Sequence, residues 1–300
     1  MMSAEFPSRT ALVLGGGGST GNAWLIGAVA GLHEAGIDVS QADVVIGTSA
    51  GATAAAQLVG ADPVRLLADI RAASEAPTPP ASAASAALTA DTAANAVAAH
   101  LARSMRLINA SRDVTEMRLK FGAAAMELAA EHDYSERWRD TVAARFTART
   151  WPYKRLLITA VDARTGEPVV FDRHSDVELV VAIAASCSSG PAYRIGKRRY
   201  IDGGYRTNAD NADLAAGYQR VLVLSPLSGR TLTPVAWGLD LVTQEQRLRS
   251  QGSDVKVLAP ATEAEHLFGA NAMNPSLRGP AAEAGHEQGL ELADAIRGWW

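Results

Sequence analysis

The segment GTSAG, residues 47–51, stands where one element of regular structure is expected to give way to another. The apolar run DVVI at residues 43–46 predicts a buried strand before it, and the small residues 50–59 predict a helix after it. A serine such as Ser49, enclosed by Gly47 and Gly51 at a turn from strand to helix, is typical of a nucleophile elbow, whose strained backbone needs neighbours almost free of side chain. On this segment alone, a helix N-cap is an equally good interpretation of the serine.

A second glycine-rich segment, LGGGGSTG at residues 14–21, lies upstream. The β-branched and apolar run TALVL at residues 10–14 predicts a strand before it. Residues 22–35 after it have apolar side chains at helical spacing and stop at Gly36, a good residue for the end of a helix. The order strand, glycine loop, helix, strand, glycine turn, helix predicts a parallel sheet with helices on its faces.

The glycine loop matches two nucleotide-binding patterns imperfectly. Residues 16–21 fit the G-x-G-x-x-G of dinucleotide-binding folds, but the next strand ends in GTSAG and lacks the acidic residue that binds the ribose. The same spacing fits a P-loop, but Asn22 and Ala23 replace the lysine and the serine or threonine that hold the phosphate. A dinucleotide-binding protein therefore remains an alternative of a different class.

A third interpretation uses both glycine-rich segments together. At the tip of the strand adjacent to Ser49, the amides of Gly16, Gly17 and Gly18 can form an oxyanion hole, because glycine leaves its N–H group unobstructed. Since it accounts for both segments in their order, we favour this third interpretation.

A nucleophilic serine also needs a base. The chain has six histidines, and none lies in a glycine-rich setting: His33, His100, His132, His174, His266 and His286. The position of Ser49, after only the second predicted strand, argues against the order of an α/β-hydrolase. Asp202 in YIDGGYRTN is the better candidate, because Gly203 and Gly204 leave its carboxylate uncrowded. Taken alone, this segment favours an ordinary Asp-Gly turn.

In this order, the segments LVLGGGGSTG, GTSAG and DGG resemble the patatin-like phospholipases, and the resemblance extends over nearly the whole chain. It implies a three-layer α/β/α sandwich with a mainly parallel central sheet. It also implies a lipid acyl hydrolase of the phospholipase A, lysophospholipase or carboxylesterase type, with no cofactor. Its residues would be the nucleophile Ser49, the general base Asp202 and the oxyanion donors Gly16, Gly17 and Gly18.

The implied mechanism needs an unusual aspartate. A carboxylate with the ordinary pKa of about 3.9 is a poor base for a serine hydroxyl. We therefore expect Asp202 to lie in a mostly dry cleft, where burial raises its pKa. The family usually has lysine or arginine at the position of Thr20, and its absence puts the headgroup preference in question. An acyltransferase that uses the same serine is the nearest alternative activity.

The remaining segments extend the sheet and add a helical region. The prolines of SEAPTPPAS, residues 74–82, predict a linker, and the alanine-rich residues 83–148 predict helices. We expect one domain over residues 1–300, with a helical insertion or lid at about 74–150, or else an ordinary helical layer there. Further predictions are strands at residues 155–163, 169–171, 220–226 and 254–260, a hairpin over 192–201, a capping box at 175–178 and a closing helix from Pro280.

The composition is that of an ordinary folded protein, with 48% hydrophobic residues, 20% charged residues and a net charge of −4. Nucleic-acid binding needs a concentrated basic surface, which this balance does not indicate. The N-terminus lacks the apolar core of a signal peptide, and no run of about 18 apolar residues indicates a membrane span. We therefore expect a cytoplasmic protein, and no histidine–acid spacing indicates a metal.

Two surface features are candidates for transient contact with a membrane. The predicted hairpin YRIGKRRY could attract anionic headgroups, and Trp299 and Trp300 could anchor at an interface. The alternatives are a solvated hairpin tip and packing of the tryptophans against the body. The hairpin cations are Arg194, Lys197, Arg198 and Arg199.

Overall fold

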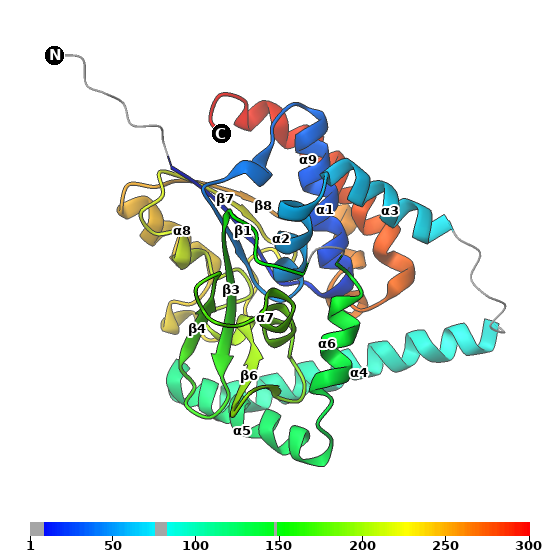
Figure 1. Cartoon of the computed structure of the whole chain (residues 1–300), viewed down its shortest axis with the longest axis vertical. Helices are drawn as coiled ribbons and strands as arrows, with labels where there is room; N and C mark the ends of the chain where they lie inside the picture. The colour runs from blue at the N-terminus through cyan, green and yellow to red at the C-terminus, as the bar shows by residue number, and fades with distance from the viewer. Residues whose placement is uncertain (1–8, 76–82, 147–148) are drawn as a thin grey trace.

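The computed structural model describes residues 9–75, 83–146 and 149–300, with the backbone alone for residues 83–94 and 96. A sheet of eight strands in the order β5-β6-β3-β2-β1-β7-β8, with β4 paired to β3, forms the middle of this described part (Figure 1). The parallel strands are β1 (Thr10–Leu14), β2 (Val44–Gly47), β3 (Arg155–Asp162), β7 (Arg220–Leu224) and β8 (Asp254–Leu258). The antiparallel strands are β4 (Pro168–Phe171), β5 (Tyr193–Ile195) and β6 (Arg198–Asp202).

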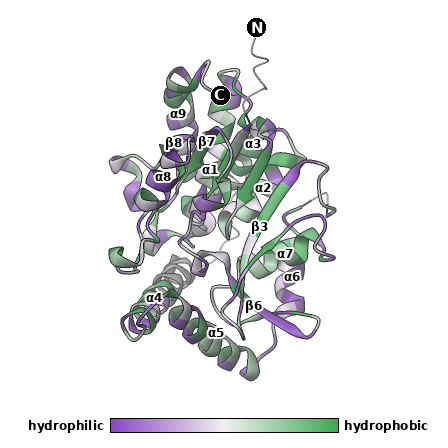
Figure 2. Cartoon of the chain, turned by 90° about the vertical axis from the view of Figure 1, so that its left-hand side faces the viewer, coloured by the Kyte–Doolittle hydropathy of each residue, from purple (hydrophilic) through white to green (hydrophobic). Residues whose placement is uncertain are grey.

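Alternate residues of the central strands face two different cores, as the pleat of a strand requires. Leu12 and Leu14 of β1 belong to the core under α1 (Gly18–Glu34), α2 (Ala50–Gly60), α7 (Leu179–Ser186) and α9 (Arg278–Ile296). Val13 belongs to the core on the other face, under α8 (Leu241–Ser250). Figure 2 shows these mainly hydrophobic strands between the two helical layers, so the predicted three-layer α/β/α sandwich is confirmed.

The closing helix packs along the first one. A methyl group on Gly27 would lie 2.0 Å from the carbonyl oxygen of Ala282, and one on Gly31 would lie 2.2 Å from that of His286. The backbones of α1 and α9 therefore touch along glycines of α1, which no larger residue would allow. After α9 ends at Ile296, the indole N–H of Trp299 donates to Asp254 at 2.6 Å. The two terminal tryptophans thus pack against the rest of the protein, which is the alternative to their role as membrane anchors.

The alanine-rich region is helical, as predicted. It consists of α4 (Ala83–Asn109), α5 (Val114–Glu131) and α6 (Ser135–Ala143), and it is preceded by α3 (Pro63–Glu75), which occupies the start of the predicted linker. The rest of that linker, residues 76–82, and residues 147–148 lie outside the described residues. Gly122 of α5 lies directly against the residue that follows β3, since a methyl group there would be 1.9 Å from the carbonyl oxygen of Ala163. In the ranges that the structure describes, no helix is long and apolar enough to cross a bilayer.

Two local predictions are wrong. The first helix begins at Gly18 instead of residue 22, because the end of the glycine loop already forms its first turn. The capping box at residues 175–178 does not form: α7 starts at Leu179, and the Glu178 side chain makes no capping bond. The Ser175 hydroxyl donates instead to Asp172 at 2.9 Å, a local bond that competes with the cap.

Candidate active site

Ser49 occupies a sharp turn between β2 and α2. Its backbone angles are φ 53° and ψ −116°, in the left-handed region that is strained for a residue with a side chain. A methyl group on Gly51 would lie 1.9 Å from the carbonyl oxygen of Leu14, and one on Gly47 would lie 2.6 Å from the Cα of Ala52. Both glycines are therefore required by close backbone contacts. The Ser49 side chain makes no capping hydrogen bond, so it is free for another role.

The backbone of Ser49 is held on both sides by Ser186, the last residue of α7, and by Cys187, which follows that helix. The Ser49 N–H donates to the Ser186 hydroxyl at 2.9 Å, and the Cys187 thiol donates to the Ser49 carbonyl oxygen at 3.1 Å. Burial raises the pKa of Cys187 to about 12, so the thiol stays protonated and is a structural donor. The sequence AASCSSG thus supplies contacts that hold the strained turn.

Asp202 ends β6 and is 7% exposed. Burial raises the pKa of its carboxyl group to about 6, although a hydrogen bond from the Gly204 N–H, at 2.8 Å, and the Ser49 hydroxyl both oppose the rise. The expectation of a buried aspartate with a raised pKa is confirmed. The Ser49 hydroxyl thus lies close enough to Asp202 to lower the pKa of the carboxyl group, which is the proximity that a nucleophile and its base require.

The glycine loop lies beside Ser49. A methyl group on Gly16 would be 3.5 Å from the Cβ of Ser49, which places the loop against the elbow. However, the Gly16 N–H donates to the carbonyl oxygen of Ala209 at 2.8 Å. The prediction that Gly16 is an oxyanion donor is therefore wrong, because its only N–H is already used.

Gly17 and Gly18 keep their N–H groups free within the described chain, since they lie at the start of α1 where no intrahelical acceptor exists. Two helices begin here, α1 after Gly17 and α2 after Ser49. The positive ends of both favour negative charge at this place. The arrangement can therefore stabilise a developing oxyanion next to a serine and a buried carboxylate.

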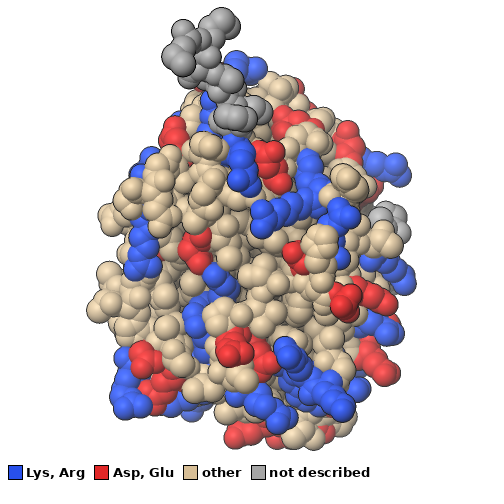
Figure 3. Space-filling model, turned by 60° about the vertical axis from the view of Figure 1, so that its left-hand side comes forward, with Lys and Arg blue, Asp and Glu red and all other residues tan. Residues whose placement is uncertain are grey.

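Other candidate groups lie elsewhere. His286 is bonded to Glu34 at 2.7 Å, and across the described residues no histidine is hydrogen-bonded to Ser49 or Asp202. The same ranges contain no cluster of His, Cys, Asp or Glu that could hold a metal ion. In the cationic hairpin, Arg194 and Arg199 both form ion pairs with Asp133, at 2.8 Å and 3.3 Å. Acidic and basic side chains are interspersed on the face that Figure 3 draws.

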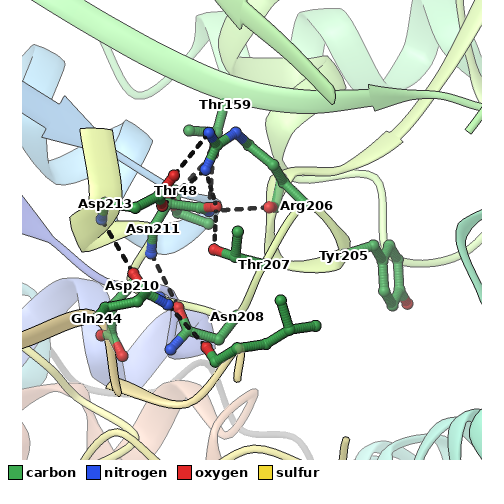
Figure 4. A network of polar contacts seen from close by, with 12 residues as sticks. Thr48, Thr159, Tyr205, Arg206, Thr207, Asn208, Asp210, Asn211, Asp213 and Gln244 are labelled. Carbon is green, nitrogen blue, oxygen red and sulfur yellow. Dashed lines mark hydrogen bonds and ion pairs between the residues drawn. The ribbon is translucent and has the colours of Figure 1, made fainter. Parts of the chain in front are cut away.

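Sequence reasoning missed the polar residues behind the site. Thr48 and Asn211 are buried between the Ser49 turn and the Asp202 loop, and Arg206 holds Asn211 from the other side (Figure 4). The only available signal was the unusually polar run YRTNADNAD after DGG, which by itself indicates an exposed loop.

Comparison with known proteins agrees with this geometry. A model of the family described as patatin-like phospholipase matches residues 12–215, which include the glycine loop, Ser49 and Asp202. The chain therefore belongs to the patatin-like phospholipase family, a family of lipid acyl hydrolases. No curated protein sequence matches the chain.

Two solved structures are similar to this chain over most of its length. VipD from Legionella pneumophila has 13% identity and a TM-score of 0.41, over 96% of this chain and 67% of that one. The type III effector protein ExoU has 18% identity and a TM-score of 0.37, over 96% of this chain and 53% of that one. The chain thus spans about half the length of ExoU.

Proposed function

We propose that this protein is a serine hydrolase that cleaves acyl ester bonds of lipids through a Ser49–Asp202 dyad, with the oxyanion bound by Gly17 and Gly18. The observation that carries the proposal is the buried Asp202 carboxylate, whose pKa is raised to about 6 beside the strained turn that presents Ser49. A carboxyl group of this pKa is ionised at neutral pH and is a stronger base than an exposed aspartate.

The proposed reaction begins with attack of the Ser49 oxygen on the ester carbonyl carbon while Asp202 accepts the hydroxyl proton. The carbonyl oxygen becomes an oxyanion, which accepts hydrogen bonds from the Gly17 and Gly18 amides. When the tetrahedral intermediate collapses, the bond to the alcohol oxygen breaks and Asp202 returns the proton to that oxygen. An acyl ester of Ser49 remains.

The second half of the reaction repeats these steps with water. Asp202 accepts a proton from the water as its oxygen attacks the acyl carbon, and the same oxyanion site is used again. Collapse of the second intermediate breaks the bond to the Ser49 oxygen, which takes the proton back. The products are a fatty acid and an alcohol, such as a lysophospholipid or a glycerol derivative.

We infer further that the acyl chain occupies a mainly apolar cavity of about 450 Å³, whose lining also includes Arg230 and Glu265. Its wall includes Pro226, which packs against Gly17, and Leu101, which comes from α4. The volume lies within the range of about 300–1,000 Å³ that small-molecule sites have. Because α4 supplies part of this wall, the alanine-rich insertion would act as a lid over the acyl chain.

The proposal is tested with Ser49→Ala and Asp202→Ala on a panel of esters that vary in acyl length and headgroup. Each variant should lose several orders of magnitude in turnover, because a nucleophile or its base has been removed. Labelling by a fluorophosphonate should disappear in Ser49→Ala. Near-wild-type turnover in either variant would end the dyad proposal. Adding an alcohol acceptor separates hydrolysis from acyl transfer, since a transferase would form a new ester instead of free fatty acid.

A further inference from the structure

Asn211 is a buried side chain that the reaction above does not use. It is 0% exposed and precedes the short helical turn Ala212–Ala215. Its backbone lies in the left-handed region, with φ 54° and ψ 38°. Asparagine tolerates this conformation better than most residues do, which explains the residue type only in part.

Every hydrogen-bonding position of the Asn211 amide group has a partner nearby. The Nδ2 group donates to the Thr48 hydroxyl and to the Gly203 carbonyl oxygen, both at 2.9 Å. The Oδ1 atom accepts from Arg206 at 3.1 Å and from the Thr207 hydroxyl at 2.8 Å. Because a carbonyl oxygen can only accept and a guanidinium can only donate, these partners allow the amide only one orientation.

The two nearest acceptors of the Nδ2 group are neighbours of the proposed dyad. Thr48 directly precedes Ser49, and Gly203 directly follows Asp202. One planar amide therefore ties the turn that carries the nucleophile to the loop that carries the base. Figure 4 shows Asn211 close to Thr48 and Arg206. Thr159 of β3 adds to the same contact, because its hydroxyl donates to the Thr48 hydroxyl at 3.0 Å.

The amide is itself anchored from behind. Arg206 forms a two-pronged ion pair with Asp213, at 2.8 Å and 2.9 Å, and this guanidinium is the one that donates to Asn211. The Asp213 N–H donates to Gln244 of α8 at 3.0 Å. Gln244 therefore bonds to the backbones of Asp213 and Leu239 and contacts neither the Asn211 amide nor the residues beside the dyad.

We propose that Asn211 is a positioning residue that sets the distance between the Ser49 hydroxyl and the Asp202 carboxylate. This inference rests on the proposed dyad. Ser49 and Asp202 come from segments far apart in the chain, so their distance depends on how the two backbones are held, and Asn211 bonds to the residue next to each. A misplacement of about 1 Å costs about 100-fold in rate in such arrangements.

The test is the Asn211→Gly variant, because glycine keeps the left-handed backbone while the amide is removed. The kcat for a short-chain ester should fall about 10-fold to 100-fold with KM nearly unchanged. Without the bond from Asn211 to Gly203, the Asp202 loop admits water, so the pKa of the Asp202 carboxyl group falls from about 6 toward its ordinary value. The acid limb of the kcat/KM profile should therefore move to lower pH.

Two further variants make the result decisive. Asn211→Asp keeps the shape of the side chain but places a second acceptor against the Gly203 carbonyl oxygen, so kcat should fall in this variant too. It tests the inference independently if Asn211→Gly does not fold. Gln244→Ala removes another buried amide that contacts Asp213 but neither dyad loop, so it should lower thermal stability and leave the acid limb in place. A purely structural role for Asn211 would give the same pH profile in all folded variants.

Two results would overturn the inference: wild-type kcat and pH profile in a folded Asn211 variant, or the same shift of the acid limb in Gln244→Ala. The Ser49→Ala variant keeps this outcome apart from failure of the dyad. If Ser49→Ala is inactive while Asn211 variants are normal, only the positioning role fails. If Ser49→Ala stays active, the proposed function itself fails.

Discussion

Asp202→Asn is expected to abolish hydrolysis and, at neutral pH, to make the fold more stable. Burial raises the pKa of the Asp202 carboxyl group from 3.8 to about 6, so the folded protein holds this charge against a cost. Asparagine has no charge, is close in size and still offers an oxygen to the Gly204 N–H. The difference between the two pKa values corresponds to about 3 kcal/mol of unfolding free energy.

The sign of the pH dependence follows from proton binding. Between pH 3.8 and about 6 the folded state holds more protons on Asp202 than the unfolded state does, so wild-type stability falls as pH rises through this window. The amide side chain that the variant carries instead does not titrate. The advantage of the variant should therefore be complete above about pH 7 and nearly absent at about pH 4.

Denaturant unfolding of both proteins at these two pH values measures the effect. A gain of about 3 kcal/mol at the higher pH would raise the melting temperature by roughly 5 °C. Asp210→Asn is a matched control, because burial also raises the pKa of Asp210 to about 6 although it lies outside the dyad. It should gain stability and keep hydrolysis. An Asp202→Asn protein that is no more stable than wild type at neutral pH would refute the reasoning.

Three more predictions concern the turn, the base and the cavity. Gly51→Ala puts a methyl group 1.9 Å from the Leu14 carbonyl oxygen and should lower both the melting temperature and the turnover. The control Gly60→Ala has nothing within 4 Å of the added methyl group and should be as stable and active as the wild type, so equal melting curves for the two variants would contradict the contact. For the wild type, kcat/KM should fall about tenfold per pH unit below about pH 6, and a limb near pH 4 would exclude a buried base. Leu232→Trp should fill part of the cavity and reduce the turnover of long-chain esters more than that of short-chain esters. The control Val242→Trp, at an exposed position of α8, should leave the chain-length profile unchanged; an unchanged profile in Leu232→Trp would place the acyl chain elsewhere.

Local patterns were enough to predict much of this protein. The turn around Ser49 follows from its own sequence, because a strained residue between a buried strand and a helix needs glycine on both sides. The strands β1, β2, β3, β7 and β8 follow from short apolar runs, since buried parallel strands are hydrophobic on both faces. The alternation of these strands with helices indicated the layered fold, and three ordered motifs indicated the family.

Properties that depend on partners distant in the chain needed the tertiary structure. The use of the Gly16 amide depends on the carbonyl of Ala209, and the raised pKa of Asp202 depends on burial by several elements. Asn211 looked like part of a polar surface loop, yet it lies buried between Thr48 and Gly203. The sequence by itself determined which residues can adopt the strained and extended backbones, because those preferences are local. Only packing decided which amides stay free and which charge is desolvated, because both depend on atoms that folding brings together.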